Sequence, residues 1–99
     1  MALRVKVSAR AARQIHDAAR WWAENRPAAP GAVRGDLGQA LELLAVQPGI
    51  GTPCIGTRVK GVRRLFLSRI RYVVHYRATA DTLEVLALWH ESRGEEPGP

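Results

Sequence analysis

Residues 63–90 read RRLFLSRIRYVVHYRATADTLEVLALWH and contain three successive patterns that are typical of β-strands. The first pattern covers about residues 62–67, the second residues 70–77 and the third residues 82–90. Each run is rich in β-branched, aromatic or aliphatic residues and is bounded by a short link. Because such links are too short for a crossover connection, the stretch predicts an antiparallel β-meander.

The second of these strands shows the clearest alternation. Successive side chains of a strand point to opposite sides of a sheet, so we expect its basic residues to lie together on one face. The third strand is nearly all apolar, which predicts a central place in the sheet with both faces covered. One expected face of the second strand carries Ile70, Tyr72, Val74 and Tyr76, and the other carries Arg69, Arg71, Val73, His75 and Arg77.

The N-terminal part of the chain predicts one strand and one helix. Residues 3–7 (LRVKV) alternate apolar and basic side chains as a half-buried strand does, and Ser8 stands where a helix N-cap belongs. From residue 9 to about residue 25 apolar residues recur at helical spacing, and the Arg26-Pro27 step ends the helix. The expected apolar stripe of this helix is Ala12, Ile15, Ala19 and Trp22.

A second helix is expected from about Gly31 to Val46. Gly35 and Gly38 weaken it by about 1 kcal/mol each relative to alanine, so we expect that packing holds it and that another backbone approaches it closely. The short link between the helices predicts an antiparallel helical hairpin, and a Gly/Pro-rich loop is expected at residues 48–57. The stripe expected to face the core is Val33, Leu37, Ala40, Leu41 and Leu44.

Together these elements predict an α+β fold with the order β-α-α-β-β-β. We expect the helical hairpin to pack on one face of a mostly antiparallel sheet, and the opposite face to carry the arginines. The pattern leaves open which place the N-terminal strand takes in the sheet. A chain of 99 residues suits one domain, expected over residues 1–99 with its core at about 3–91 and a frayed tail at 92–99.

Positive charge is concentrated in the second half of the chain. The net charge is +6, because 13 arginines and 2 lysines outnumber 9 acidic residues, and no Asp or Glu lies between Leu43 and Ala80. Such clustering predicts an anionic partner, either nucleic acid, a ribosome surface or an acidic protein segment, in preference to a merely solvated surface. The basic residues of this run are Arg58, Lys60, Arg63, Arg64, Arg69, Arg71 and Arg77.

No catalytic motif stands out in the sequence. It has no P-loop, no GxSxG and no HExxH, and its one cysteine, Cys54, forms no metal-binding cluster, so we expect no metal and no cofactor. His90 ends the last strand, where a histidine can move protons in RNA cleavage, and Arg71 on the neighbouring strand can neutralise a phosphate. A histidine that merely orders the tail explains the same position more simply. Trp21 lies off the helical stripe, so we expect it to contact a partner.

The location in the cell follows from what the composition excludes. No apolar run approaches the ~20 residues that span a bilayer, and the start of the chain, MALRVKVSARAAR, has no apolar signal region. A single cysteine allows no intramolecular disulfide. We therefore expect a cytoplasmic protein that does not bind membranes.

The whole succession of segments resembles the RelE/ParE superfamily of bacterial toxins from type II toxin–antitoxin systems. VKVSARAARQIHDAARWWAENRP (5–27) resembles the first strand and helix of that superfamily, and LGQALELLAVQPGIGTP (37–53) resembles its second helix and the turn that follows. RRLFLSRIRYVVHYRATADTLEVLALWHESRG (63–94) resembles its three-strand meander, whose last strand ends in a histidine. The likeness covers about residues 3–94.

The resemblance implies a toxin that a cognate antitoxin inhibits in a hetero-oligomer, by wrapping an acidic and apolar C-terminal segment across helices and sheet. ParE-like members poison DNA gyrase, whereas RelE-like members cleave mRNA on the ribosome. By position, Arg71 and His90 match the phosphate-binding Arg and the near-terminal His of some nuclease branches, and Lys60 and Arg63 stand where others have basic residues. The chain departs from the nuclease pattern because it has no Glu between Leu43 and Leu83 and no Tyr after His90.

Three functional hypotheses follow. The preferred one is a toxin that inhibits DNA gyrase, and its rival is a ribosome-dependent mRNA endonuclease that uses Arg71 and His90. The third is a non-toxic basic binding module with the same fold. The residues expected to bind a partner are Trp21, Arg58, Lys60, Arg63, Arg64, Arg69, Arg71, His75 and Arg77.

Overall fold

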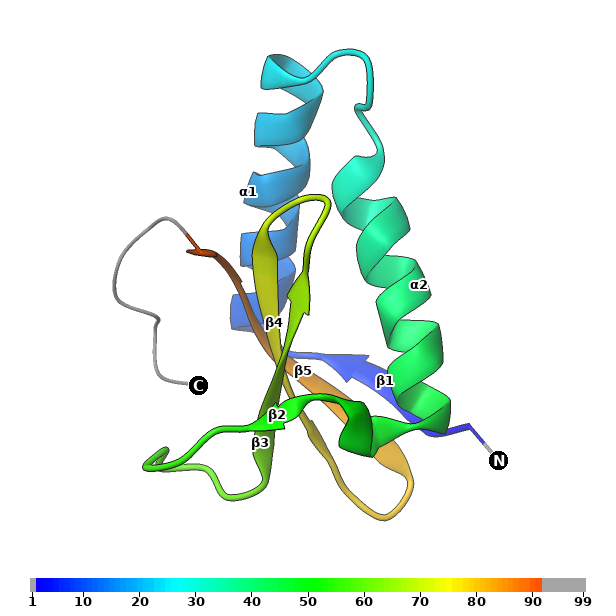
Figure 1. Ribbon diagram of the computed structural model, residues 1–99, viewed down its shortest axis with the longest axis vertical. Helices are drawn as coiled ribbons and strands as arrows, with labels where there is room; N and C mark the ends of the chain where they lie inside the picture. Colours follow the sequence, from blue (N-terminus) through cyan, green and yellow to red (C-terminus); the bar gives the residue numbers. More distant parts are fainter. Residues whose placement is uncertain (1, 92–99) are drawn as a thin grey trace.

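The computed structural model describes residues 2–91 as two helices on one face of a five-stranded sheet (Figure 1). No helix in this part of the chain is long and apolar enough to cross a bilayer. The arrangement confirms the predicted α+β fold. The helices are α1 (Ala9–Asn25), α2 (Ala32–Val46) and the short 3₁₀-helix η1 (Pro48–Ile50), and the strands are β1 (Arg4–Val7), β2 (Thr52–Pro53), β3 (Val62–Leu67), β4 (Tyr72–Ala78) and β5 (Thr82–His90).

The sheet has the strand order β1-β5-β4-β3-β2. The antiparallel pairing of β3 with β4 and of β4 with β5 confirms the meander. β1 runs parallel to β5, with Val5 opposite Leu83, and forms one edge of the sheet. β2 forms the other edge and pairs only with Arg63 and Arg64 of β3, inside the segment that the sequence predicts as a loop.

The first helix begins as predicted, and three residues of its predicted stripe face the core, since Ile15 is buried and Ala19 and Trp22 pack against the core cluster. Ser8 caps it, since the Ser8 Oγ accepts a hydrogen bond of 3.0 Å from the Ala11 N–H. Ala12 is exposed, and the buried residues are Ala11, Ile15 and Ala18. A polar contact also joins α1 to the sheet, because Gln14 Oε1 accepts from the Leu88 N–H of β5 at 2.9 Å.

The second helix presents the predicted stripe to the core. Val33, Leu37, Ala40 and Leu44 are buried, and Leu41 is half-buried. The close backbone approach expected at Gly35 and Gly38 is wrong, because a Cβ at either position would meet nothing within 4 Å. The two helices lie side by side (Figure 1) and share one core with β4 and β5.

The start of β4 corrects the predicted arginine face. The strand begins at Tyr72 and not at Ile70, because the chain turns over residues 68–71. Arg71 has a φ of 63°, and its N–H closes the turn on the Leu67 C=O at 2.8 Å. The alternation predicted for residues 70–77 therefore includes residues that belong to a turn. Arg69 and Arg71 lie in that turn and not on the face of the sheet that carries Arg77.

Candidate functional site

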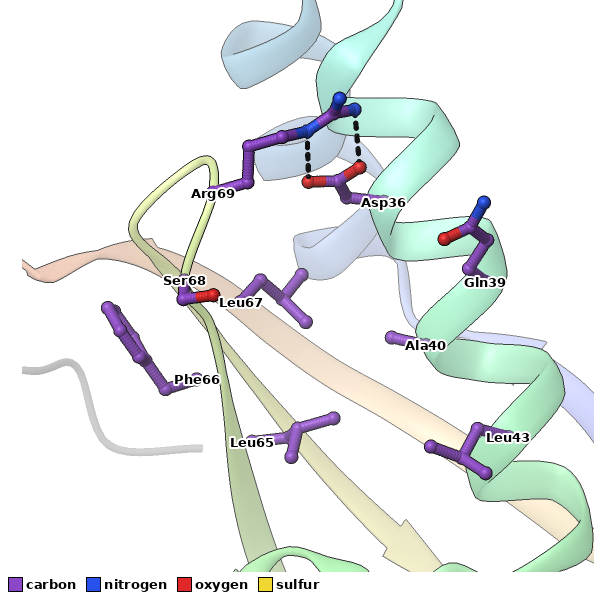
Figure 2. A pocket seen from close by; sticks show the side chains of 9 residues that line it. All are labelled: Asp36, Gln39, Ala40, Leu43, Leu65, Phe66, Leu67, Ser68 and Arg69. Atoms are coloured by element: carbon purple, nitrogen blue, oxygen red, sulfur yellow. Dashed lines mark hydrogen bonds and ion pairs between the residues drawn. The ribbon is translucent and has the colours of Figure 1, made fainter.

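A groove of about 520 Å³ lies between α2 and β3 (Figure 2). Figure 2 shows Leu65 and Leu67 of β3 pointing toward α2, and Phe66 pointing away from it. Leu43 and Phe66 are 46% and 45% exposed, so the chain leaves two large apolar side chains of this region in water. Exposed apolar groups that line a concave surface are typical of binding sites. The groove is lined by Asp36, Gln39, Ala40, Leu43, Leu65, Phe66, Leu67, Ser68 and Arg69.

An ion pair closes one end of the groove. Arg69 donates from Nε to Asp36 Oδ2 at 2.9 Å and from Nη2 to Asp36 Oδ1 at 2.5 Å (Figure 2). The hydrogen bond to Asp36 and the charge of that carboxylate raise the pKa of Arg69. Such a two-pronged contact fixes the geometry of both side chains. It joins the turn after β3 to α2.

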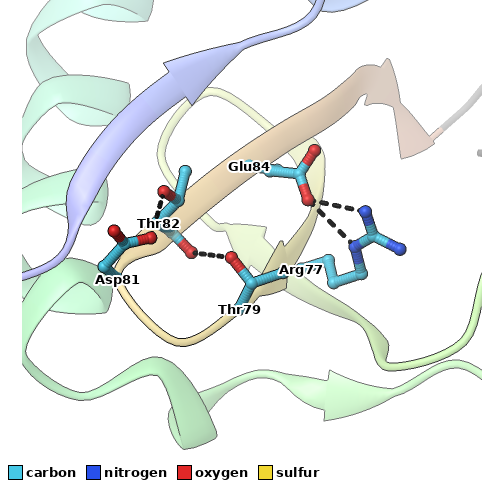
Figure 3. A network of polar contacts seen from close by, with 5 residues as sticks. All are labelled: Arg77, Thr79, Asp81, Thr82 and Glu84. Atoms are coloured by element: carbon cyan, nitrogen blue, oxygen red, sulfur yellow. Dashed lines mark hydrogen bonds and ion pairs between the residues drawn. The ribbon is translucent and has the colours of Figure 1, made fainter.

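Two further arginines of the acid-free run pair with acids from outside that run. Arg77 donates from Nε and Nη2 to Glu84 Oε1 of β5 at 3.1 and 2.6 Å, beside the turn between β4 and β5 (Figure 3). Arg71 forms an ion pair with Glu91, and its guanidinium carbon lies 6.0 Å from the centre of the Phe66 ring. The fold thus neutralises much of the charge that looks unopposed in the sequence.

Of the remaining basic residues, Arg63 contacts the backbone of a neighbouring segment. Arg63 donates from Nη1 to Gly51 O at 2.7 Å and to Gly49 O at 3.3 Å, which ties β3 to the segment that contains η1 and β2. Arg58, Lys60 and Arg64 are exposed. The positive surface that the structure presents to solvent is therefore smaller than the sequence predicts.

His75 differs from the prediction. It is 2% exposed, in the middle of β4 between β3 and β5, and so does not form part of an exposed basic face. His75 pairs with Arg64 of β3, and both faces of β4 are buried at that point.

Arg71 and His90 come to the same end of the sheet. The Glu91 N–H donates to the Arg71 C=O at 3.0 Å, which links the end of β5 to the turn before β4. The His90 ring packs edge-on against the Tyr72 ring, with 4.9 Å between the ring centres and 84° between the planes. Both side chains thus have contacts within the fold, namely Glu91 for Arg71 and Tyr72 for His90.

Trp21 lies near the end of α1 and is 44% exposed, as expected for a side chain off the stripe. It contacts Trp22 edge-on, with ring centres 6.3 Å apart, and the Arg26 guanidinium carbon lies 5.3 Å from the centre of its ring. Exposed Trp and Arg side chains are frequent at the centres of protein interfaces. The end of α1 is therefore a second surface with the composition of a contact site.

Sequence reasoning missed the role of Tyr76. Its hydroxyl donates to the Pro48 C=O at 2.7 Å and accepts from the Gly51 N–H at 2.9 Å. Burial raises the pKa of this phenol, and the hydrogen bond from Gly51 and the charge of Arg63 oppose the rise. The tyrosine fixes η1 and β2 at the edge of β3. Gly51 is the residue of the sequence that reflects this contact. A Cβ at Gly51 would lie 2.3 Å from the Tyr76 hydroxyl oxygen, so the position requires glycine.

Comparison with known proteins identifies the family. The family model described as the ParE toxin of type II toxin–antitoxin system, parDE, matches residues 5–94. Protein Y4kP of Sinorhizobium fredii (strain NBRC 101917 / NGR234) is 31% identical over 87 residues, covering 88% of this chain and 86% of that protein. The fold is similar to a chain of the chromosomal ParDE TA system from P. aeruginosa, with a TM-score of 0.71 and 22% identity over 89% of this chain and 95% of that one. This chain therefore belongs to the ParE toxin family of type II toxin–antitoxin systems.

Proposed function

We propose that this protein is a toxin that inhibits DNA gyrase in the cytoplasm and is neutralised by direct binding of its cognate antitoxin. The observation that carries the proposal is the match of residues 5–94 to the ParE toxin family. Gyrase is the target that the resemblance of the sequence to ParE-like toxins implies. The ion pair of Arg71 with Glu91 favours the same choice. A nuclease that used Arg71 to bind a phosphate would first have to release this side chain from Glu91.

The groove and its surroundings support the antitoxin as the resting partner. Leu43 and Phe66 offer apolar surface at the groove, and the exposed Arg58 and Lys60 between β2 and β3 offer positive charge on the same half of the chain. An acidic and apolar segment complements both properties. A short acidic reading frame beside the gene for this chain, with a DNA-binding N-terminal half, is the expected source of that segment.

Induced expression in bacteria tests the proposal. We expect growth arrest, a DNA-damage response and accumulation of cleaved gyrase–DNA complexes, and co-expression of the neighbouring reading frame should restore growth. Primer extension on cellular mRNA is the control for the nuclease hypothesis. Cuts at codon-phased positions with intact DNA would show that gyrase is the wrong target, and normal growth of the induced cells would favour a non-toxic binding module.

A further inference from the structure

The loop between β2 and β3, residues 54–61, carries the most exposed large apolar side chain of residues 2–91. Ile55 is 97% exposed, and the next of these side chains, Val46, is 63% exposed. Figure 1 shows the loop, drawn in green, extending away from both helices. A side chain that lies almost wholly in water buries no surface within the chain, so the packing of the fold does not explain Ile55.

The backbone holds the tip of this loop in a defined shape. The Cys54 N–H donates to the Val62 C=O at 2.9 Å, which closes the loop at its base. Within the loop, the Thr57 hydroxyl donates to the Val59 C=O at 2.6 Å. Gly56, directly after the isoleucine, has a φ of 81°, a conformation that residues with a Cβ rarely adopt. The exposed side chain is therefore presented on a turn of fixed geometry.

The segment before the loop is tied to β3. Pro53 of β2 pairs with Arg63, and the Arg63 guanidinium donates from Nη1 to the Gly51 C=O at 2.7 Å. A projecting loop with a fixed base loses less conformational entropy when it binds a partner. The loop thus has the construction of a contact element.

Arg58 and Lys60 place two positive charges beside the tip. Both are exposed, and within residues 2–91 neither side chain takes part in an ion pair or a hydrogen bond. Arg77, in contrast, is held by Glu84 of β5. The whole loop lies in the stretch without acidic residues, so its charge has one sign. These two cations are available to an anionic partner.

The combination of one apolar tip and two cations fits duplex DNA better than a protein surface. Protein interfaces are centred on clusters of anchoring side chains, whereas this loop exposes only Ile55, since Val59 is half-buried. Proteins that kink DNA insert single apolar side chains, isoleucine among them, between neighbouring base pairs from the minor groove. Cations beside such a side chain neutralise phosphates, which place one charge on about every 1.7 Å of duplex.

We propose that the loop of residues 54–61 contacts the DNA held by gyrase, with Ile55 inserted between two base pairs and Arg58 and Lys60 on the phosphates beside it. This inference rests on the proposed function, because gyrase brings the duplex to the toxin. An inserted side chain unstacks a base step and kinks the duplex. A kink at the cleaved site displaces the two ends that gyrase must rejoin, which gives a physical reason for the accumulation of cleaved DNA.

Fluorescence anisotropy with a labelled DNA duplex measures the phosphate contacts of the chain alone. Each neutralised phosphate adds about 0.9 to the steepness of log affinity against log salt, so Arg58→Gln/Lys60→Gln should flatten this slope by about 2. The matched control is Arg13→Gln/Arg34→Gln, which removes the same charge from exposed positions of α1 and α2 and should keep the wild-type slope. Equal slopes for the two double variants would overturn the phosphate contact.

A duplex with the fluorescent adenine analogue aminopurine at a TA step reports insertion, because this base brightens when it unstacks and TA steps unstack easily. We expect the wild type and Ile55→Leu to raise the fluorescence about twofold or more, and Ile55→Ser to leave it near the level of the free duplex. Val46→Ser is the control, since it removes an exposed apolar side chain from α2. Because Ile55 lies in water, Ile55→Ser should keep the thermal midpoint. Equal fluorescence with Ile55→Ser and wild type would overturn the insertion.

Trapping of cleaved DNA by purified gyrase tests the loop in the complex. We expect Ile55→Ser and Arg58→Gln/Lys60→Gln to require about tenfold or more toxin for the same amount of cleaved DNA, and the two control variants less than about threefold more. If the loop variants trap cleaved DNA as well as the wild type does, the loop inference is wrong and the proposed function stands.

Two further outcomes are distinct. If the loop variants bind the free duplex like the wild type but bind gyrase more weakly in the absence of DNA, the loop contacts the gyrase protein and the DNA contact is wrong. If the wild-type chain neither inhibits supercoiling nor traps cleaved DNA, the proposed function fails and takes this inference with it.

Discussion

Arg69, in the turn after β3, donates two hydrogen bonds of 2.9 and 2.5 Å to the carboxylate of Asp36 in α2 (Figure 2). The pair connects residues 33 positions apart and closes one end of the groove. The Asp36 side chain is only 18% exposed, whereas that of Arg69 is 66% exposed. The contact therefore joins a largely buried carboxylate of α2 to an exposed guanidinium in the turn after β3.

Replacing Asp36 by Asn tests this connection. We expect Asp36→Asn to lower the thermal midpoint at low salt, and we expect the difference from wild type to shrink toward about 1 M salt, because salt screens partly exposed charges. The matched control is Asp81→Asn, which removes the 3.4 Å contact with Arg4 between side chains that are 73% and 81% exposed. Equal effects of the two substitutions in thermal melts would contradict the assigned role of Asp36.

Tyr76→Phe should destabilise the fold by about 1–3 kcal/mol, because it leaves the buried Gly51 N–H and the partly buried Pro48 C=O without their partner. The measurement is chemical denaturation of both proteins. Because burial raises the pKa of Tyr76 above its ordinary value of 10.0, the folded state holds its proton longer than the unfolded state. The stability that this phenol contributes is complete below about pH 10 and falls as the pH rises above that value. Tyr76→Phe should lose this part of the alkaline dependence, and parallel pH profiles of the two proteins would contradict the assignment.

Glycine substitutions should have opposite signs in the loop and in α2. Gly51→Ala places a Cβ 2.3 Å from the Tyr76 hydroxyl oxygen and 2.8 Å from the Arg64 carbonyl oxygen, so we expect a loss of about 3 kcal/mol or more. Gly35→Ala and Gly38→Ala meet open space and should each stabilise by about 1 kcal/mol. Free energies of unfolding from denaturant titration check both signs. A destabilising Gly38→Ala would show that α2 has a close neighbour after all.

The sequence predicted the positions of the helices and strands better than the side-chain contacts on their surfaces. Periodicity and capping residues located both helices, the Ser8 cap and the three-strand meander, because each depends on local spacing. The arginine face failed at Arg69 and Arg71, because alternation cannot reveal a turn closed by a residue with positive φ. The partners of Arg69, Arg71 and Arg77 were also invisible, since Asp36, Glu84 and Glu91 all lie outside the acid-free run. The groove depends on how α2 sits against β3, which no single segment encodes.

Arg71 offers a test that separates structure from toxicity. Its φ of 63° is costly for a residue with a Cβ, so Arg71→Gly should be more stable than Arg71→Ala by about 1 kcal/mol, although both lose the ion pair with Glu91. Thermal or chemical unfolding measures that difference. Because the proposed target is gyrase, both variants and His90→Ala should remain toxic when they are expressed at wild-type levels. Loss of toxicity in well-folded Arg71→Gly and His90→Ala would favour the nuclease hypothesis.

The most direct measurement is DNA supercoiling by purified gyrase with the purified chain present. The proposal predicts that the chain inhibits supercoiling and traps cleaved DNA bound to gyrase, and that prior addition of the antitoxin prevents both effects. Tyr76→Phe, if it retains the fold, should act like the wild type, because Tyr76 only supports the edge of β3. Unimpaired supercoiling and no cleaved DNA at an excess of folded toxin would contradict the proposed action on gyrase.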